Sequence, residues 1–127
     1  MDVNMLKEPD VINAVCTRLE KAGYKINHKS MPNEHGNDIV AKKEGVNKRL
    51  VIEAKGATTS KDTSRKGQSF DAAQIRVHVS EAFYKAAHEI PNIKVNGEDI
   101  YSCIALPATR THQRLIRKFD FIEKQIY

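Results

Sequence analysis

Two acids in the stretch NDIVAKKEGVNKRLVIEAKG, residues 37–56, have the type and the spacing that metal-assisted chemistry needs. The stretch reads as two short strands, 38–43 and 48–55, joined by the turn residues EGVN. If the turn is centred in the middle of EGVN, Asp38 lies directly opposite Glu53. Opposed Cβ atoms in a hairpin are roughly 4.5–5.5 Å apart. Two carboxylates at that separation repel each other unless a cation joins them or one of them takes a proton.

A divalent metal ion removes this repulsion. Mg²⁺ prefers oxygen ligands and usually takes one or two protein carboxylates, with water and phosphate completing its shell. The expected ligands of Mg²⁺ or Mn²⁺ are the side chains of Asp38 and Glu53 and the backbone carbonyl of Ala54. Because side chains alternate along a strand, Lys55 points to the same side as Glu53. An ammonium group there can assist an attacking water or neutralise charge that builds on a phosphate.

This set of residues predicts metal-assisted hydrolysis of a phosphodiester, and a plainer interpretation stands beside it. A Glu-x-Lys triplet on a strand is common, and usually it is a solvated face. Asp38 in register across the hairpin favours the functional interpretation, as does the apolar run LVI that leads to Glu53.

The hydrophobic pattern predicts the elements that must position these residues. In 9–22 an apolar face at spacings of three and four indicates a helix, which Gly23 ends. A longer helix at 71–90 has a stripe expected to be buried: Ile75, Val79, Ala82, Phe83, Ala86 and Ile90. The other expected elements are strands at 24–29 and 100–107, a helix at about 109–118 and a short edge strand at 119–127.

The order helix, three strands, helix, strand, helix predicts an α/β (α+β) fold with a mixed central sheet and flanking helices. The nearly all-apolar strand IYSCIALP is expected to be covered on both of its faces. A length of 127 residues suits one domain over 1–127.

Composition narrows the class of protein. The chain is 40% hydrophobic and 29% charged, and it contains no apolar run near the ~20 residues of a membrane span. Its start lacks the apolar stretch of a secretory signal, and its two cysteines lack metal-ligand spacing, so a cytoplasmic protein with reduced thiols is expected. A net charge of +5 fits a polyanionic partner such as nucleic acid, although many unrelated proteins carry as much.

Basic side chains in two places are candidates for contacts with a DNA backbone. The long polar stretch 56–70 carries Lys61, Arg65 and Lys66, and phosphate contacts typically come from Arg, Lys, Ser and Thr. The last helix carries a basic stripe at spacings of four and three: Arg110, Arg114 and Arg117. The alternatives are an ordinary surface loop and a solvated helix face.

The motifs GNDIVA and LVIEAKG, with 14 residues between Asp38 and Glu53, resemble those of the PD-(D/E)xK nuclease superfamily. The resemblance is closest to the branch that contains archaeal Holliday-junction resolvases and Mrr-like restriction endonucleases, and it covers roughly residues 8–106. It implies a restriction-endonuclease-like core in the order αβββαβ, followed here by a C-terminal helix. Asn37 stands where the family name has proline.

The resemblance also implies roles for individual residues. Asp38 and Glu53 would be metal ligands and Lys55 the catalytic lysine. Relatives often add an acid from the first helix, for which Glu8 is the first candidate, and a glutamine on the helix after the lysine strand, which Gln74 matches. The alternatives for the helix acid are Asp10 and Glu20. His78, one helical turn after Gln74, is a further candidate for contact with substrate.

The expected function is therefore that of a Mg²⁺-dependent endonuclease acting on DNA. A chain of this size has little room for a separate target-reading domain. Cleavage of both strands would need a second active site, and a homodimer is the simplest way to supply it. The main alternative is a catalytically inactive module on the same fold that binds nucleic acid or protein. A small-molecule phosphohydrolase is a third possibility, but the sequence has no nucleotide-binding signature.

Overall fold

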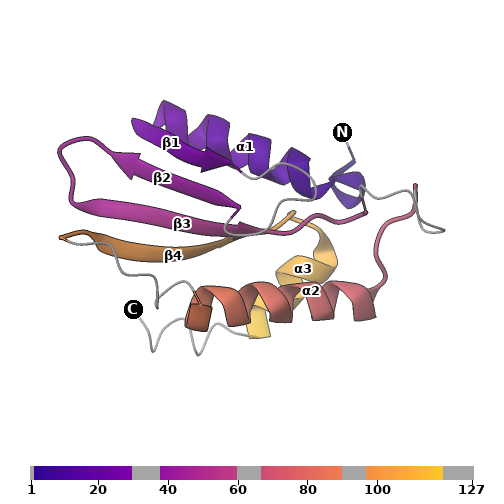
Figure 1. Cartoon of the computed structure of the whole chain (residues 1–127). Coiled ribbons are helices and arrows are strands. Elements are labelled where there is room, and N and C mark those ends of the chain that lie inside the picture. Colours follow the sequence, from indigo (N-terminus) through magenta and orange to yellow (C-terminus); the bar gives the residue numbers. More distant parts are fainter. Residues whose placement is uncertain (1, 30–37, 60–66, 90–96, 119–127) are drawn as a thin grey trace.

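The computed structural model of the chain describes residues 2–29, 38–59, 67–89 and 97–118 (Figure 1). The described part is a mixed α+β fold with a four-stranded sheet and three α-helices. Its elements are η1 (Val3–Met5), α1 (Glu8–Lys21), β1 (Tyr24–Lys29), β2 (Ile39–Lys43), β3 (Lys48–Ala54), α2 (Ala72–Tyr84), η2 (Lys85–Glu89), β4 (Asp99–Ala105) and α3 (Arg110–Lys118). This order of helices and strands is the one that the sequence predicts.

The sheet is mixed and its strands follow in the order β1-β2-β3-β4. β2 pairs with both β1 and β3 in antiparallel fashion, and β3 pairs with β4 in parallel. In the β2–β3 hairpin Ile39 lies opposite Ile52 and Ala41 lies opposite Leu50. This register is the predicted one, so the hairpin places Asp38 and Glu53 next to each other. The turn needs Gly45, whose φ of 78° is one that residues with a side chain rarely adopt.

α1 covers one face of the sheet, and α2 and α3 lie on the other (Figure 1). The face beneath α1 forms the core: Val11, Ile12 and Cys16 of the helix meet Ile39, Ala41, Leu50, Ile52 and Ala54 of the hairpin. The N-terminus of α1 is fixed by Asp10, whose carboxylate accepts a hydrogen bond from the Lys7 N–H at 2.9 Å. On the opposite side α2 buries Ile75, Val79 and Ala82, which belong to its predicted stripe.

A strand covered on both faces is buried on both sides, and β3 is buried at every position from Leu50 to Ala54. Val51 is 1% exposed and Ile52 is 4% exposed, although they point to opposite faces of the sheet. Glu53 is also only 5% exposed. The strand therefore places a carboxylate where little of its surface reaches solvent.

Three sequence-based expectations need correction, and two more fall on residues that the structure does not describe. β4 is not covered on both faces: it is the last strand of the sheet among the described residues, and Tyr101 is 47% exposed. The predicted helix 71–90 is regular only to Tyr84, after which η2 is π-helical. The strand at 48–55 ends at Ala54. The expected strand 119–127 and Ile90 lie outside the described residues.

In the described ranges, no helix is long and apolar enough to cross a membrane.

Candidate metal centre

The start of α1 is held against the end of β3 by backbone contacts. The Ala57 N–H donates a hydrogen bond to the Leu6 carbonyl at 2.7 Å, and Lys7 and Thr58 form a parallel bridge. Gly56 directly precedes Ala57, and a Cβ atom at Gly56 would stand 2.5 Å from the backbone nitrogen of Glu8. Only a residue without a side chain permits this approach. Gly56 therefore brings the first residue of α1 to the carboxyl end of the hairpin.

The side chain of Asp38 is held in place at the C-terminal end of β3. Its side chain is 8% exposed, and its Oδ2 accepts a hydrogen bond from the Ala54 N–H at 2.7 Å. This bond aims the carboxylate along the end of β3 and leaves its second oxygen available for another partner. The predicted use of the Ala54 carbonyl as a metal ligand stays a prediction.

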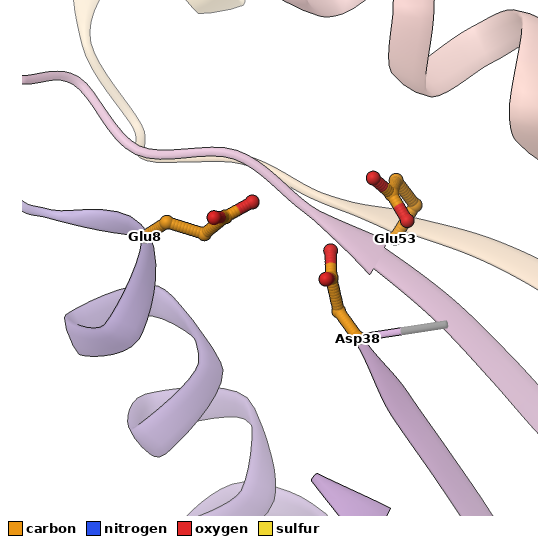
Figure 2. Close-up of side chains that lie close together, drawn as sticks. All are labelled: Glu8, Asp38 and Glu53. Carbon is orange, nitrogen blue, oxygen red and sulfur yellow. The ribbon is translucent and has the colours of Figure 1, made fainter. Parts of the chain in front are cut away.

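Three carboxylates from three elements converge at this point. Glu8, Asp38 and Glu53 each present a carboxylate oxygen, and these oxygens all lie within 4.8 Å of one another (Figure 2). Asp38 and Glu53 are buried and Glu8 is partly buried. The other two candidates for the helix acid do not join them, since Asp10 caps α1 and Glu20 lies exposed near its far end.

Two lysines flank Glu53, one near each carboxylate oxygen. Lys55 Nζ lies 3.8 Å from Oε1 and also 3.5 Å from Oε2 of Glu81. Lys85 Nζ lies 3.0 Å from Oε2 of Glu53. The contact with Lys85 is an ion pair whose direction does not make a good hydrogen bond, and Oε2 accepts none from any described residue. Glu53 thus has a buried oxygen that is ion-paired with Lys85 but accepts no hydrogen bond from a described residue.

The charged form of Glu53 is disfavoured by its burial and by the neighbouring carboxylate of Asp38. Burial, and then the charge of Asp38, raise the pKa of Glu53 to about 7, against the opposing effect of Lys85 and Lys55. A buried carboxylate is costly unless it is paired or coordinates a metal, and the two lysines still leave the pKa of Glu53 raised. Oxygen ligands of this kind and number suit Mg²⁺ or Mn²⁺. The residues present therefore fit a divalent metal ion.

Binding of a divalent metal is expected to weaken as the pH falls below 7. A proton competes with the metal for Glu53, whose pKa is about 7, so the apparent affinity falls by up to about tenfold per pH unit below that value. Above pH 8 it levels off. Calorimetric titration of Mn²⁺ at pH 5.5, 6.5, 7.5 and 8.5 measures this. An affinity that stays constant between pH 5.5 and 7.5 would contradict the prediction.

Lys55 and Glu53 line an open cleft of about 490 Å³. The rest of the lining comes from one face of α2 and from the first residue of η2: Ser80, Glu81, Tyr84 and Lys85. The C-terminal part of α2 and the start of η2 therefore present a mostly polar face to the site. Lys85 is the functional candidate that the sequence interpretation missed. Its position one turn after Glu81 on that face was the signal, but the sequence does not show that the face meets Glu53.

Gln74 and His78 are the two residues of α2 that the sequence marks as candidates for contact with substrate. Gln74 forms a capping box with Asp71, in which its Oε1 accepts from the Asp71 N–H at 2.9 Å. His78 packs edge-on against Phe70, with ring centroids 4.5 Å apart. Burial and the charge of Lys55 lower the pKa of His78, so its ring lies within electrostatic range of the site. Their contact with substrate stays a prediction, and Gln74 already has a structural role.

The predicted basic stripe on α3 forms one surface. Exposed guanidinium groups line a cavity of about 310 Å³ together with one amide: Arg110, Arg114, Arg117 and Gln113. The remaining predicted DNA contacts, Lys61, Arg65 and Lys66, lie outside the described residues.

Comparison of the chain with protein-family models, with curated proteins and with solved structures found no match.

Proposed function

We propose that the protein is a metal-dependent endonuclease that hydrolyses phosphodiester bonds of DNA. The observation that carries the proposal is the convergence of Glu8, Asp38 and Glu53 within 4.8 Å at the edge of an open cleft. The cluster is more than a group of surface acids, because Glu53 is buried and keeps an oxygen without a hydrogen bond. The resemblance to PD-(D/E)xK nucleases supports the same activity on a restriction-endonuclease-like fold.

Each residue of the site has a separate role in the proposed reaction. Asp38, Glu53 and Glu8 hold Mg²⁺ or Mn²⁺, which, when bound, stabilises negative charge on the phosphate and favours ionisation of the attacking water. Lys55 stands 3.8 Å from Glu53 and faces the cleft, where its ammonium orients the water and neutralises charge in the transition state. Glu81, 3.5 Å from the Lys55 ammonium, keeps that side chain in place.

The charge of the molecule supports a nucleic acid as the partner. The net charge is +5 despite the acidic cluster, and the α3 cavity is lined by three arginines and a glutamine. Guanidinium groups bind phosphate with two parallel hydrogen bonds, and such contacts fix the position of a nucleic-acid backbone. A homodimer would supply the second centre that cleavage of both strands requires.

The test is a cleavage assay on supercoiled plasmid, linear duplex, a four-way junction, a flap and single-stranded DNA, each with Mg²⁺ or Mn²⁺. We expect cleavage that EDTA abolishes and that Lys55→Ala reduces by about 100-fold or more, the usual contribution of a group that transfers or steers a proton. Lys21→Ala, an exposed lysine at the end of α1, is the matched control and leaves the rate unchanged.

Two results would overturn this proposal. One is full activity of the Lys55→Ala variant. The other is binding of DNA without cleavage of any substrate in either metal, which would favour an inactive nucleic-acid-binding module on the same fold.

A further inference from the structure

The polypeptide changes its helical geometry where it passes over Glu53. α2 ends at Tyr84, and η2, which begins with Lys85, has the wider hydrogen-bonding pattern of a π-helix. The Ser102 hydroxyl of β4 donates a hydrogen bond to the Ala86 carbonyl, which ties this turn to the sheet. Turns of π-helix are rare and are frequently found at functional sites. The tie fixes the backbone of Lys85 above the end of β3.

The side chain of Lys85 reaches into the cleft rather than into solvent. Its Nζ lies 3.0 Å from Glu53 Oε2, and the two side chains are 23% and 7% exposed. Holding a partly desolvated ammonium beside a carboxylate gains little for stability, because the loss of hydration offsets most of the attraction. The pair also lines the open cleft. Stability of the fold therefore does not explain this contact.

The sum of the charges in the cluster and the cleft explains why a lysine is needed at position 85. Among the described residues, the cluster and the cleft beside it together hold four carboxylates, from Glu8, Asp38, Glu53 and Glu81, and two ammonium groups, from Lys55 and Lys85. One divalent metal ion brings the sum of these charges to zero. Without Lys85 the metal-loaded cleft would still carry one negative charge, and it would repel the negatively charged phosphodiester that it has to bind.

We propose that Lys85 binds the phosphate of the DNA bond that is cleaved. In the free protein, Glu53 holds the Lys85 ammonium in the cleft until a metal ion binds the Glu53 carboxylate. This inference rests on the proposed function of the centre. A lysine is a compact point charge with three donors, which suits a non-bridging phosphate oxygen. It follows that Lys85 competes with the metal for Glu53 in the free protein and assists the substrate once metal is bound.

The test compares Lys85→Met with the wild type in three measurements. Calorimetric titration of Mn²⁺ without DNA should show about 5-fold tighter binding by the variant, since the competing cation is gone. Anisotropy of a labelled DNA duplex in Ca²⁺ should show weaker binding, and the KM for cleavage should rise more than kcat falls, with kcat/KM about 30-fold lower. Lys85→Arg retains the charge and should recover most of the loss. Lys25→Met, an exposed lysine of β1, should change nothing.

The outcomes separate this inference from the proposed function. Equal affinity for metal and for DNA in the wild type and Lys85→Met would overturn the role of Lys85 and leave the centre intact. Weaker metal binding in a folded Lys85→Met variant would also overturn it, because Lys85 would then support the site rather than compete for it. A wild type that binds metal and DNA without cleaving would remove the proposed function alone, since the two binding comparisons still decide the role of Lys85.

Discussion

Glu53→Gln is expected to abolish cleavage and, at the same time, to stabilise the metal-free protein at pH 8. The loss of activity follows from the loss of a metal ligand: a bound metal ion contributes several kcal/mol to the transition state, and about 4 kcal/mol corresponds to a rate reduction of about 1000-fold. The gain in stability follows from the same burial that makes Glu53 a candidate ligand.

The sign of the stability change depends on the direction of the pKa shift. Folding raises the pKa of Glu53 from its ordinary value of 4.5 to about 7. Below pH 4.5 the carboxyl is neutral in both states. Between pH 4.5 and 7 the folded state binds the extra proton, so the wild type loses stability as the pH rises, by about 3 kcal/mol in all. A neutral glutamine does not lose that stability.

Urea denaturation in EDTA at pH 4.5 and at pH 8 measures the effect. The two proteins should have similar free energies of unfolding at pH 4.5, and Glu53→Gln should be the more stable at pH 8. Glu20→Gln, an exposed acid on α1, is the control and should leave the difference near zero at both values. Mn²⁺ should stabilise the wild type far more than the variant, because ligands that bind only the folded state raise its stability. A Glu53→Gln protein less stable than the wild type at pH 8 would contradict the prediction.

The hairpin could be predicted from the sequence because its information is local. The turn residues EGVN and the alternation on either side fix the register, and the register places Asp38 beside Glu53. The order of the elements follows in the same way from the periods of their apolar residues. These features need no knowledge of which distant segments meet.

The features that the sequence did not predict all depend on contacts between distant segments. IYSCIALP is apolar enough for a central strand, but β4 pairs only with β3 in the described part of the chain, and Tyr101 is left exposed. Lys85 reaches Glu53 because a π-helical turn is tied to β4. Periodicity identifies the polar face of a helix but not the strand that this face meets.

Glu8 is the clearest case, because its place in the cluster depends on a glycine 48 positions later. From the sequence, Glu8, Asp10 and Glu20 were all candidates for the helix acid. The choice is made by the pairing of the residues before α1 with those after β3. Gly56 is part of the motif LVIEAKG, but its function is to admit the backbone of Glu8 rather than to shape a turn.

Gly56→Ala is therefore expected to remove Glu8 from the metal centre. The added Cβ would lie 2.5 Å from the Glu8 nitrogen, 2.8 Å from the Lys7 carbonyl carbon and 3.0 Å from the Leu6 oxygen. These are backbone atoms, so no side-chain rotation relieves the clash, and the start of α1 has to move away from β3. We expect a loss of about 1–3 kcal/mol in the free energy of unfolding, as for other overpacked sites.

The same shift should lower the affinity for Mn²⁺ by about tenfold, as Glu8→Gln does by removing a charged ligand. If both changes act through Glu8, the variant that carries both should bind Mn²⁺ as well as the single variant with the lower affinity does. The two losses should not add, because both changes remove the same contact. Calorimetric titration of Mn²⁺ into the wild type, the two single variants and the double variant measures this.

Gly45→Ala is the control: it also strains the backbone, at a φ of 78° and a cost of about 1 kcal/mol, but nothing lies within 4 Å of the added atom. Its metal affinity should equal that of the wild type. A destabilised Gly56→Ala protein with unchanged metal affinity would mean that the centre consists of Asp38 and Glu53 alone, with Glu8 a neighbour that binds no metal.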